Sequence, residues 1–272
     1  MLIVLWIDNG LCKLCLIYSR SKDMINLKKV ELLDKMLIEL ANIIRKNYSR
    51  TYAFTYSFNI VKQLTENLDP YRDVKKELNE TGRRLSVIVE KYLESVGWNL
   101  REALRISAAA NIVDTSVLGY EAKNIEECIW DKPVIEEEVE VPKNIDVYIV
   151  LDNAGEAAID LLLAKALKLN GYRVSIVVRK ESYEIDILRN DIELNDIDVI
   201  ETYGNLSPVL YIDKGFVIAK GIANAEAYIE GGKTPSLHLL RAKCDVIARL
   251  FKVPKNSVLI VTGETLKKAF SN

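Results

Sequence analysis

The sequence predicts an α/β protein with a helical first part and a parallel sheet in the second part. Residues from about 27 to 107 show helical periodicity and many charged side chains. After Pro142, short Val- and Ile-rich runs alternate with helical segments, the pattern of a parallel sheet with crossover helices. The segment between Pro133 and Pro142 carries three consecutive glutamates and fits an exposed connector. We therefore predict a helical subdomain over 1–130 and an α/β domain over 131–272.

The individual elements follow from local patterns. Two helical stretches, "KVELLDKMLIELANIIRK" and "DVKKELNETGRRLSVIVEKYLESV", are separated by Pro70 in the first part. The second part offers five strands, namely "DVYIVL", "RVSIVV", "IDVIE", "FVIA" and "SVLIVT".

Composition excludes several classes of partner. The 272 residues include 37 basic and 39 acidic side chains, so no global positive field exists to hold a nucleic acid. The apolar run "MLIVLWI" is too short to span a membrane and has no basic residues before it. We expect a cytoplasmic protein with no nucleic-acid and no membrane partner, and the sequence leaves the oligomeric state open.

The stretch "VYIVLDNAGEAAIDLLLAKALKLNGYRVSIVVRK" predicts a strand, a tight turn, a helix and a second strand. Ligands of open parallel sheets bind at the carboxyl ends of strands, and a helix N-terminus there favours anions. Yet this turn carries Asp152, Asn153 and Glu156, whose carboxylates would repel a phosphate unless a cation lies between. Such oxygen donors suit Mg²⁺ or Mn²⁺. The alternative is that Asp152 or Asn153 only caps the helix.

Two further strand ends supply polar side chains. Asp186 lies just beyond "SIVVR" and would face Asp152 and Asn153 across a crevice if both strands belong to one βαβ unit. Lys220 ends "FVIAK" and could neutralise a phosphate, although a lysine there is also compatible with an ordinary solvated loop charge.

With these motifs the chain resembles the metal-dependent damage-control phosphatases, the ARMT-like group. The resemblance rests on ordered motifs, which are "CKLC", "DPYRDVKKE", "ALRISAAANIVD", "DNAGE", the Asp186 region, "AKGIANAE" and "LLRAKCDVIARLFKVPKNSVLI". It implies a Rossmann-like three-layer α/β domain beside an all-α subdomain. It also implies hydrolysis of small phosphomonoesters, such as sugar phosphates and related phosphorylated metabolites, with Mn²⁺, Co²⁺, Ni²⁺ or Mg²⁺.

The resemblance assigns roles residue by residue. Asp152, Asn153 and Asp186 match the metal ligands of the family. The residues that match its substrate pocket are Lys220, Asn224, Asn111 and Asp114. In the expected reaction the metal polarises the phosphate and activates water, while Lys220 and helix N-termini offset negative charge. Glu156 or Asp186 is the candidate for proton transfer.

Two departures from the family pattern keep a second function open. Ala110 and Ala223 stand where the family usually has glycine, so substrate approach could be restricted. A non-catalytic protein that binds a phosphate ligand with a metal is therefore the first alternative. The second is a dinucleotide-dependent oxidoreductase, but "DNAGEA" lacks the G-x-G-x-x-G spacing.

Cys12, Cys15 and Cys244 match a cysteine set found in one branch of the family. A C-x-x-C pair with one distant cysteine could hold a second metal or form a redox centre. The same residues are also compatible with buried thiols that only pack, and a reducing compartment favours free thiols.

Overall fold

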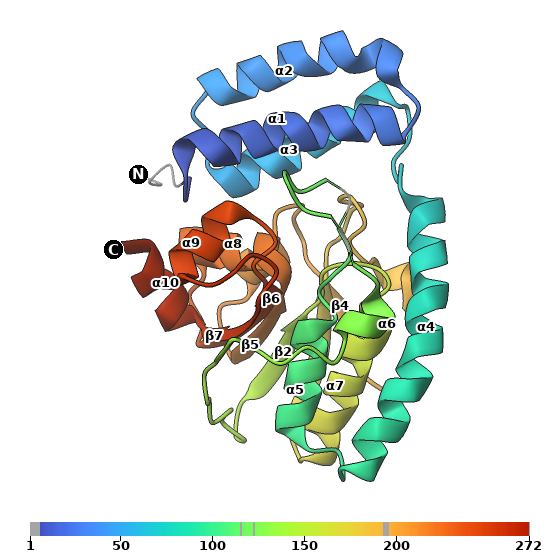
Figure 1. Ribbon diagram of the computed structural model, residues 1–272, viewed down its shortest axis with the longest axis vertical. Helices are drawn as coiled ribbons and strands as arrows, with labels where there is room; N and C mark the ends of the chain where they lie inside the picture. The colour runs from blue at the N-terminus through green and yellow to red at the C-terminus, as the bar shows by residue number, and fades with distance from the viewer. Residues whose placement is uncertain (1–5, 115, 122, 193–195, 272) are drawn as a thin grey trace.

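The computed structural model describes residues 6–114, 116–121, 123–192 and 196–271. Three helices form a bundle at one end of the molecule (Figure 1): α1 (Asn9–Asn26), α2 (Leu33–Arg45) and α3 (Arg50–Leu64). Asp8 caps α1 by accepting hydrogen bonds from the amides of Gly10 at 3.0 Å and Leu11 at 2.8 Å. A 3₁₀ turn, Val30–Leu32, links α1 to α2. The bundle has its own apolar core, which includes Leu16, Met24, Met36, Leu40, Ile43 and Phe58.

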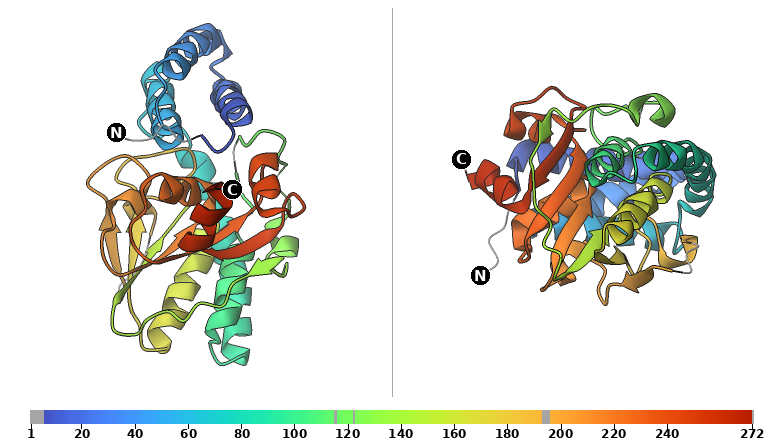
Figure 2. Two further views of the ribbon diagram at one scale, coloured as in Figure 1. Left: turned by 90° about the vertical axis from the view of Figure 1, so that its left-hand side faces the viewer. Right: turned by 90° about the horizontal axis from the view of Figure 1, so that it is seen from below.

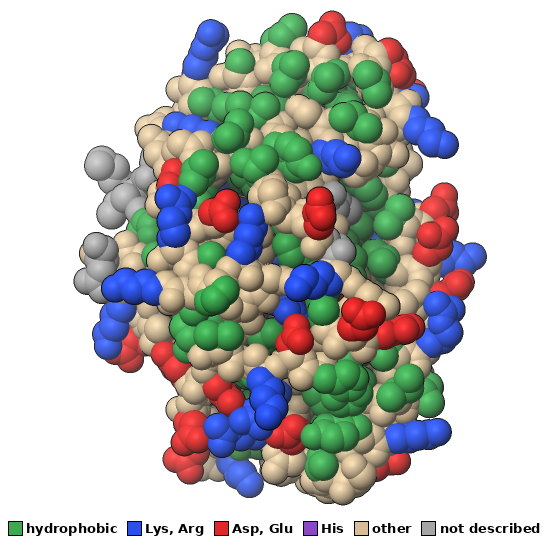
Figure 3. Space-filling model, viewed as in Figure 1, with side chains coloured by type: hydrophobic (Ala, Val, Ile, Leu, Met, Phe, Trp, Pro, Cys, Tyr) green, Lys and Arg blue, Asp and Glu red, His purple; other side chains and the backbone are tan. Residues whose placement is uncertain are grey.

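The outer surface of this bundle keeps several apolar side chains in solvent. On α1, Leu14 and Ile25 are about half exposed, and on α2 Ile38 is 61% exposed. Figure 3 shows apolar side chains spread over α1 and α2 on the face it draws. These residues lie on the side opposite the bundle core, so internal packing does not account for them.

Two helices lead from the bundle to the sheet. The long α4 (Arg72–Ser95) runs down one side of the molecule, and α5 (Leu100–Ala109) turns back beside it (Figure 1). Both pack against α7 (Ala157–Leu169), and α5 also contacts strands of the sheet. The predicted domain boundary between residues 130 and 131 stays a prediction. α5 precedes it and yet covers one face of the sheet, with α4 packed against α7 of the same layer.

The sheet has seven strands in the order β1-β7-β6-β5-β2-β3-β4. Their bounds are β1 Ile135–Glu136, β2 Asp146–Val150, β3 Arg173–Val178, β4 Asp198–Glu201, β5 Phe216–Lys220, β6 Ser236–Arg241 and β7 Val258–Thr262. β2 to β6 are mutually parallel, which confirms the predicted α/β fold with a mainly parallel sheet.

One strand departs from the expected direction. The "SVLIVT" segment forms β7, which runs antiparallel to β6, with Arg241 opposite Val258. The helix between them, α9 (Asp245–Phe251), has only seven residues. The last residues of β6 pair with the first residues of β7, so the chain returns directly and makes no crossover.

Helices cover both faces of the sheet. α5 and α7 lie on one face, while α8 (Gly221–Gly231) and α10 (Gly263–Ser271) lie on the other. The right-hand view of Figure 2 shows this three-layer arrangement from below. Successive residues of β5 enter different cores, since Val217 packs with α8 and Ile218 with α7. The remaining short elements are α6 Ile125–Cys128, η2 Arg189–Asp191 and η3 Pro208–Tyr211.

The contact between α4 and the turn after β2 is unusually close. A Cβ atom added at Gly82 would lie 2.0 Å from the carbonyl oxygen of Gly155. Gly155 itself has a φ of 88°, in the region that favours glycine, and its amide donates to Asn79 Oδ1 at 3.0 Å. Glycines on both sides therefore let the backbone of α4 support the "DNAGE" turn.

We predict that Gly82→Ala lowers the free energy of unfolding by about 1–3 kcal/mol, because the methyl group would overpack this contact. The control is Gly10→Ala in α1, where an added Cβ meets only Asp8 Oδ1 at 3.6 Å. There alanine should be neutral or gain up to about 1 kcal/mol through helix propensity. Denaturant unfolding of both variants measures the difference. A stabilised Gly82→Ala protein would contradict the close contact.

Candidate functional site

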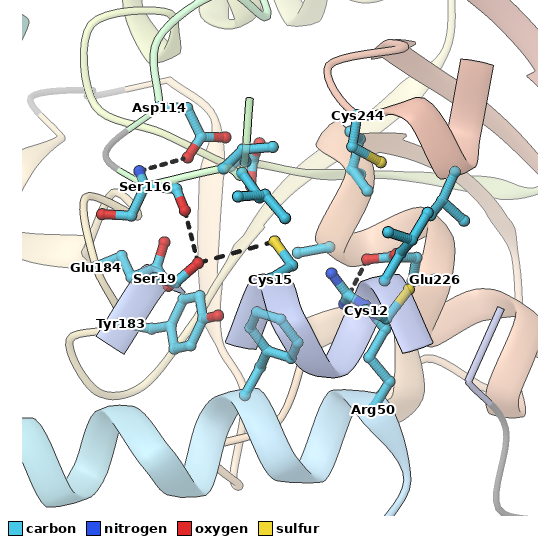
Figure 4. A pocket seen from close by; sticks show the side chains of 18 of the residues that line it. Cys12, Cys15, Ser19, Arg50, Asp114, Ser116, Tyr183, Glu184, Glu226 and Cys244 are labelled. Carbon is cyan, nitrogen blue, oxygen red and sulfur yellow. Dashed lines mark hydrogen bonds and ion pairs between the residues drawn. The ribbon is translucent and has the colours of Figure 1, made fainter. Parts of the chain in front are cut away.

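A pocket lies where the carboxyl ends of the parallel strands face the helical bundle. Its walls come from α1, α3 and α8, from the loops after β2, β3 and β6, and from the segment after α5. Figure 4 shows side chains of these elements converging on the pocket. Of the residues predicted from sequence, those that line it are Cys12, Cys15, Asp114, Asp152, Asn153, Asp186 and Cys244.

Backbone pairing holds Asp152, Asn153 and Asp186 together. Asn153 and Asp186 form an isolated antiparallel β-bridge. The amide of Ala154 donates to the carbonyl of Ile185 at 2.8 Å, and the amide of Ile187 donates to the carbonyl of Asp152 at 2.9 Å. The expected meeting of these two loops is therefore present in the structure. Whether the three side chains bind a metal stays a prediction.

The capping alternative does not describe this turn. The N-cap residue of α7 is Glu156, and its side chain makes no capping hydrogen bond. Asp152 Oδ2 instead accepts from the side-chain amides of Asn111 at 3.1 Å and Asn153 at 2.9 Å. These contacts orient the carboxylate within the site.

The carboxyl groups of Asp152 and Asp186 are buried near other acidic groups, which disfavours their charged forms. Burial raises the pKa of Asp152 well above its usual value, and the nearby charges of Asp186 and Glu156 raise it further. Burial also raises the pKa of Asp186 to about 6, although the guanidinium of Arg179 opposes this shift. Arg179 Nε donates to Asp186 Oδ2. A cation between the carboxylates would relieve their repulsion, so the donor set fits a divalent metal ion.

Glu156 and Asn111 are fully buried and do not line the pocket. Asn111 Nδ2 donates to Glu156 Oε1 at 2.9 Å as well as to Asp152, while Asn153 Nδ2 donates to Glu156 Oε1 at 3.1 Å. Glu156 thus orients the side-chain amides of Asn111 and Asn153 without itself lining the pocket. The proton-transfer role of Glu156 and the substrate contact of Asn111 stay predictions.

Lys220 lies behind the site and not on its surface. Its side chain is completely buried, and its Nζ is 3.1 Å from Glu156 Oε2 and 3.0 Å from Asp160 Oδ1. Burial alone would lower the pKa of Lys220, but the carboxylates of Asp160 and Glu156 outweigh this and raise it. The structure therefore places Lys220 in an ion-pair network, whereas the sequence predicted a phosphate contact or a solvated loop charge.

Asn224 is likewise buried beneath the pocket. Its Nδ2 donates to the carbonyls of Leu151 at 3.2 Å and Lys220 at 2.8 Å, and its Oδ1 accepts from Ser207 Oγ at 2.6 Å. It joins the ends of β2 and β5. Gly221, which directly follows β5, has a φ of 76°. Glycine is required there, because an added Cβ would lie 1.9 Å from Asp152 Oδ2.

Asp114 lines the pocket and has a basic partner that sequence reasoning missed. Lys243 Nζ is 3.2 Å from Asp114 Oδ2 and donates to the carbonyl of Val113 at 2.8 Å. Burial would lower the pKa of Lys243, but Asp114, Glu156 and Asp152 raise it. Lys243 follows the end of β6, and this position just beyond a strand is the sequence feature that could have identified it as a site residue. Arg179, which follows β3, was missed in the same way.

The three cysteines line the part of the pocket formed by α1, α8 and the loop after β6. Figure 4 shows them beside Glu226 and Arg50, which form an ion pair. Burial raises the pKa values of Cys12 and Cys15, and raises that of Cys244 to about 12. Thiols in this state are poor nucleophiles in the metal-free protein. The packing interpretation and the second metal or redox centre both stay predictions.

Acidic, cysteine and histidine side chains are the usual metal ligands in proteins. Within the described part of the chain, no three such side chains are arranged to hold a metal ion. The candidate set of Asp152, Asn153 and Asp186 contains only two carboxylates and is completed by an amide. The single histidine, His238, is buried in β6 and hydrogen-bonds to Ser236 Oγ at 2.9 Å.

The fold and the pocket define a Rossmann-like α/β protein with an oxygen-rich site at its strand ends, covered by a helical bundle. Residues 14–259 match the family model of the damage-control phosphatase ARMT1-like domain. The chain therefore belongs to this family.

Individual relatives agree with this assignment. A damage-control phosphatase of Archaeoglobus fulgidus is 28% identical over 249 residues, covering 80% of this chain and 86% of the relative. Damage-control phosphatase PH1575 of Pyrococcus horikoshii is 23% identical over 258 residues, covering 85% and 88%. A crystal structure of this DUF89 family protein from P. horikoshii has a TM-score of 0.73 at 21% identity, covering 93% and 97% of the two chains.

We predict that Lys220→Met lowers the free energy of unfolding by about 3–5 kcal/mol, because Glu156 and Asp160 would stay buried without their cation. The control is Lys165→Met, whose half-exposed ion pair with Glu90 should contribute less than about 1 kcal/mol. Denaturant unfolding measures both. A Lys220→Met protein of wild-type stability that no longer binds phosphate would instead support the substrate contact predicted from sequence.

Proposed function

We propose that this protein is a metal-dependent phosphatase that hydrolyses small phosphomonoesters, such as sugar phosphates or related phosphorylated metabolites. Family membership supports a phosphatase with a damage-control role. The observation that carries the finer proposal is the β-bridge between Asn153 and Asp186. It brings oxygen donors from two loops to one pocket wall.

Asp152, Asn153 and Asp186 are the residues that would hold the divalent cation, which we take to be Mn²⁺, Co²⁺, Ni²⁺ or Mg²⁺. When bound, such an ion polarises phosphate oxygens and lowers the pKa of coordinated water. Arg179 fixes Asp186, and Asn111 fixes Asp152, so the carboxylates are oriented before any ligand arrives. Of the two candidates for proton transfer, Asp186 is the better placed, because Glu156 does not line the pocket.

Two buried cations near the carboxylate wall support phosphate as the ligand, although neither lines the pocket. Lys243 is held beside the pocket by Asp114 and Val113, and Arg179 lies behind Asp186. These cations would offset negative charge that develops on phosphate oxygens. This assigns to Lys243 the electrostatic role that the sequence suggested for Lys220.

The position of the pocket supports a small substrate. Helices α1 and α3 stand opposite the strand ends, so the pocket is bounded on both sides. Apolar side chains, among them Leu11, Phe54 and Ile222, also line the pocket. A phosphate at the carboxylates and an organic group against these apolar side chains would fit. The expected cytoplasmic location and the expected absence of nucleic-acid and membrane partners remain predictions.

Ala223 lines the pocket, so the observation behind a non-catalytic, metal-dependent phosphate-binding protein persists. The oxidoreductase alternative is dropped, because the family is one of phosphatases. Within the described residues, no helix is both long enough and apolar enough to cross a bilayer.

We predict that protein stripped with chelator releases no phosphate from small phosphomonoesters and regains activity with Mn²⁺, Co²⁺, Ni²⁺ or Mg²⁺. Phosphate release from a metabolite panel, with each metal in turn, is the measurement.

Asp186→Asn should lose activity by a factor of about 100 or more, since charged oxygen donors are hard to replace. Asp198→Asn, on the exposed β4, is the matched control.

Three outcomes separate the possibilities. Turnover that persists in excess chelator, with metal absence verified, would refute metal dependence. Metal-dependent binding of a sugar phosphate without phosphate release would identify the non-catalytic alternative. Equal loss of activity in Asp186→Asn and Asp198→Asn would show that the Asp186 carboxylate has no special role.

A further inference from the structure

The loop that carries Asp186 is held from two sides. One side is the backbone pairing with the loop after β2, through Ile185 and Ile187. The other side is the helical bundle, where Arg20 of α1 forms an ion pair with Glu184. Glu184 lies two residues before Asp186 and lines the same pocket. Arg20 of the bundle is therefore linked to the candidate metal site by one intermediate residue, Glu184.

Arg20 is fixed in this position by its surroundings. Its side chain has no exposed surface, and its guanidinium also forms an ion pair with Asp23 at 2.8 Å. The guanidinium carbon lies 5.2 Å from the ring of Phe58 and 5.9 Å from the ring of Tyr183. Asp23 in turn accepts a hydrogen bond from the hydroxyl of Tyr71 at 2.5 Å. A charge buried among such partners cannot move without leaving another charge uncompensated.

Glu184 needs support, because its backbone φ is 46°, in the left-handed region that residues other than glycine rarely adopt. Such conformations persist where the surrounding structure determines them. The side chain of Glu184 is 15% exposed and its carboxylate meets Arg20. The ion pair thus holds the chain in the conformation that turns Asp186 toward Asn153.

Ile185, next to Asp186, packs into the apolar core of the bundle, but the other ion pair and hydrogen bond described between the helices and this loop lie farther from Asp186 along the chain. Lys62 of α3 pairs with Glu181 at 3.2 Å, but the Glu181 side chain is 46% exposed. Ser182 Oγ donates to Asp69 Oδ1 at 2.7 Å. A half-exposed ion pair contributes little to stability. The Arg20–Glu184 pair is therefore the better candidate for control of the Asp186 position.

We propose that Arg20 is a positioning residue that sets the orientation of Asp186 through Glu184, and thereby the affinity of the site for a divalent cation. This inference rests on the proposed function, because it assumes that Asp152, Asn153 and Asp186 bind the cation. It makes the bundle part of the metal site as well as a wall of the pocket.

The sign of the effect in Arg20→Gln distinguishes positioning from simple electrostatics. Removing a positive charge near a cation site should strengthen cation binding by Coulomb's law. Loss of a positioning contact should weaken it by roughly 10- to 100-fold, as for other outer partners of metal ligands. Calorimetric titration of the metal-free protein with Mn²⁺ alone measures the affinity, and melting curves verify that the variant is folded.

Glu184→Asp tests the same contact if Arg20→Gln fails to fold. Aspartate keeps the charge and tolerates the left-handed backbone, but it is one methylene too short to reach Arg20 in the same way. Positioning predicts weaker Mn²⁺ binding in this variant, whereas a role of charge alone predicts no change. Glu181→Gln is the matched control, because it removes an exposed ion pair from the same loop and should bind Mn²⁺ like the wild type.

The outcomes are separable. Wild-type protein that binds no Mn²⁺ would overturn the proposed function and this inference with it. Wild-type protein that binds Mn²⁺, with unchanged or stronger binding in folded Arg20→Gln or unchanged binding in Glu184→Asp, would overturn the inference alone. Weaker binding in both variants, with Glu181→Gln unchanged, is the result that we expect.

Discussion

The site depends on one constraint, the backbone pairing between the loops after β2 and β3. Those strands are neighbours in the sheet and parallel, so their carboxyl ends meet at one edge. The hydrogen bonds that Ala154 and Ile187 donate then lock the loops together, and Asp152, Asn153 and Asp186 share one pocket wall. α4 supports the turn from outside, where Gly82 meets Gly155. Without this pairing the carboxylates would belong to two separate loops.

Charge is arranged in layers around this wall. Beneath it, Lys220 compensates Glu156 and Asp160 and is not an ion-pair partner of Asp152 or Asp186 among the ion pairs of the described residues. At the sides, Arg179 and Lys243 each contact one acidic residue of the pocket. A cation suits the space between the carboxylates, and the buried cations nearby favour an anion bound next to it. The proposed phosphatase reaction requires both.

The sequence predicted five of the seven strands and the meeting of Asp152, Asn153 and Asp186, because both follow from local patterns and from the geometry of parallel strands. It did not predict the short β1, nor β6, whose residues Ser236–Arg241 stand in a stretch with a helical pattern. It could not predict the burial of Lys220. Its partner Asp160 comes from α7 and Ser107 from α5, and only the packing of these helices brings them together. A lysine at a strand end has the same local sequence whether it faces solvent or a buried carboxylate. The same limit explains why Arg179, Lys243 and Arg20 were missed, and why β7 was expected to run parallel.

The central claim is that Asp152, Asn153 and Asp186 hold one divalent cation in the pocket beneath α1 and α3. The most direct measurement is anomalous diffraction from crystals of the wild-type protein soaked with Mn²⁺. We predict one strong anomalous peak within coordination distance, about 2–2.3 Å, of oxygen atoms from all three residues. A fully occupied peak at Cys12, Cys15 and Cys244, with none between the two aspartates, would contradict the account.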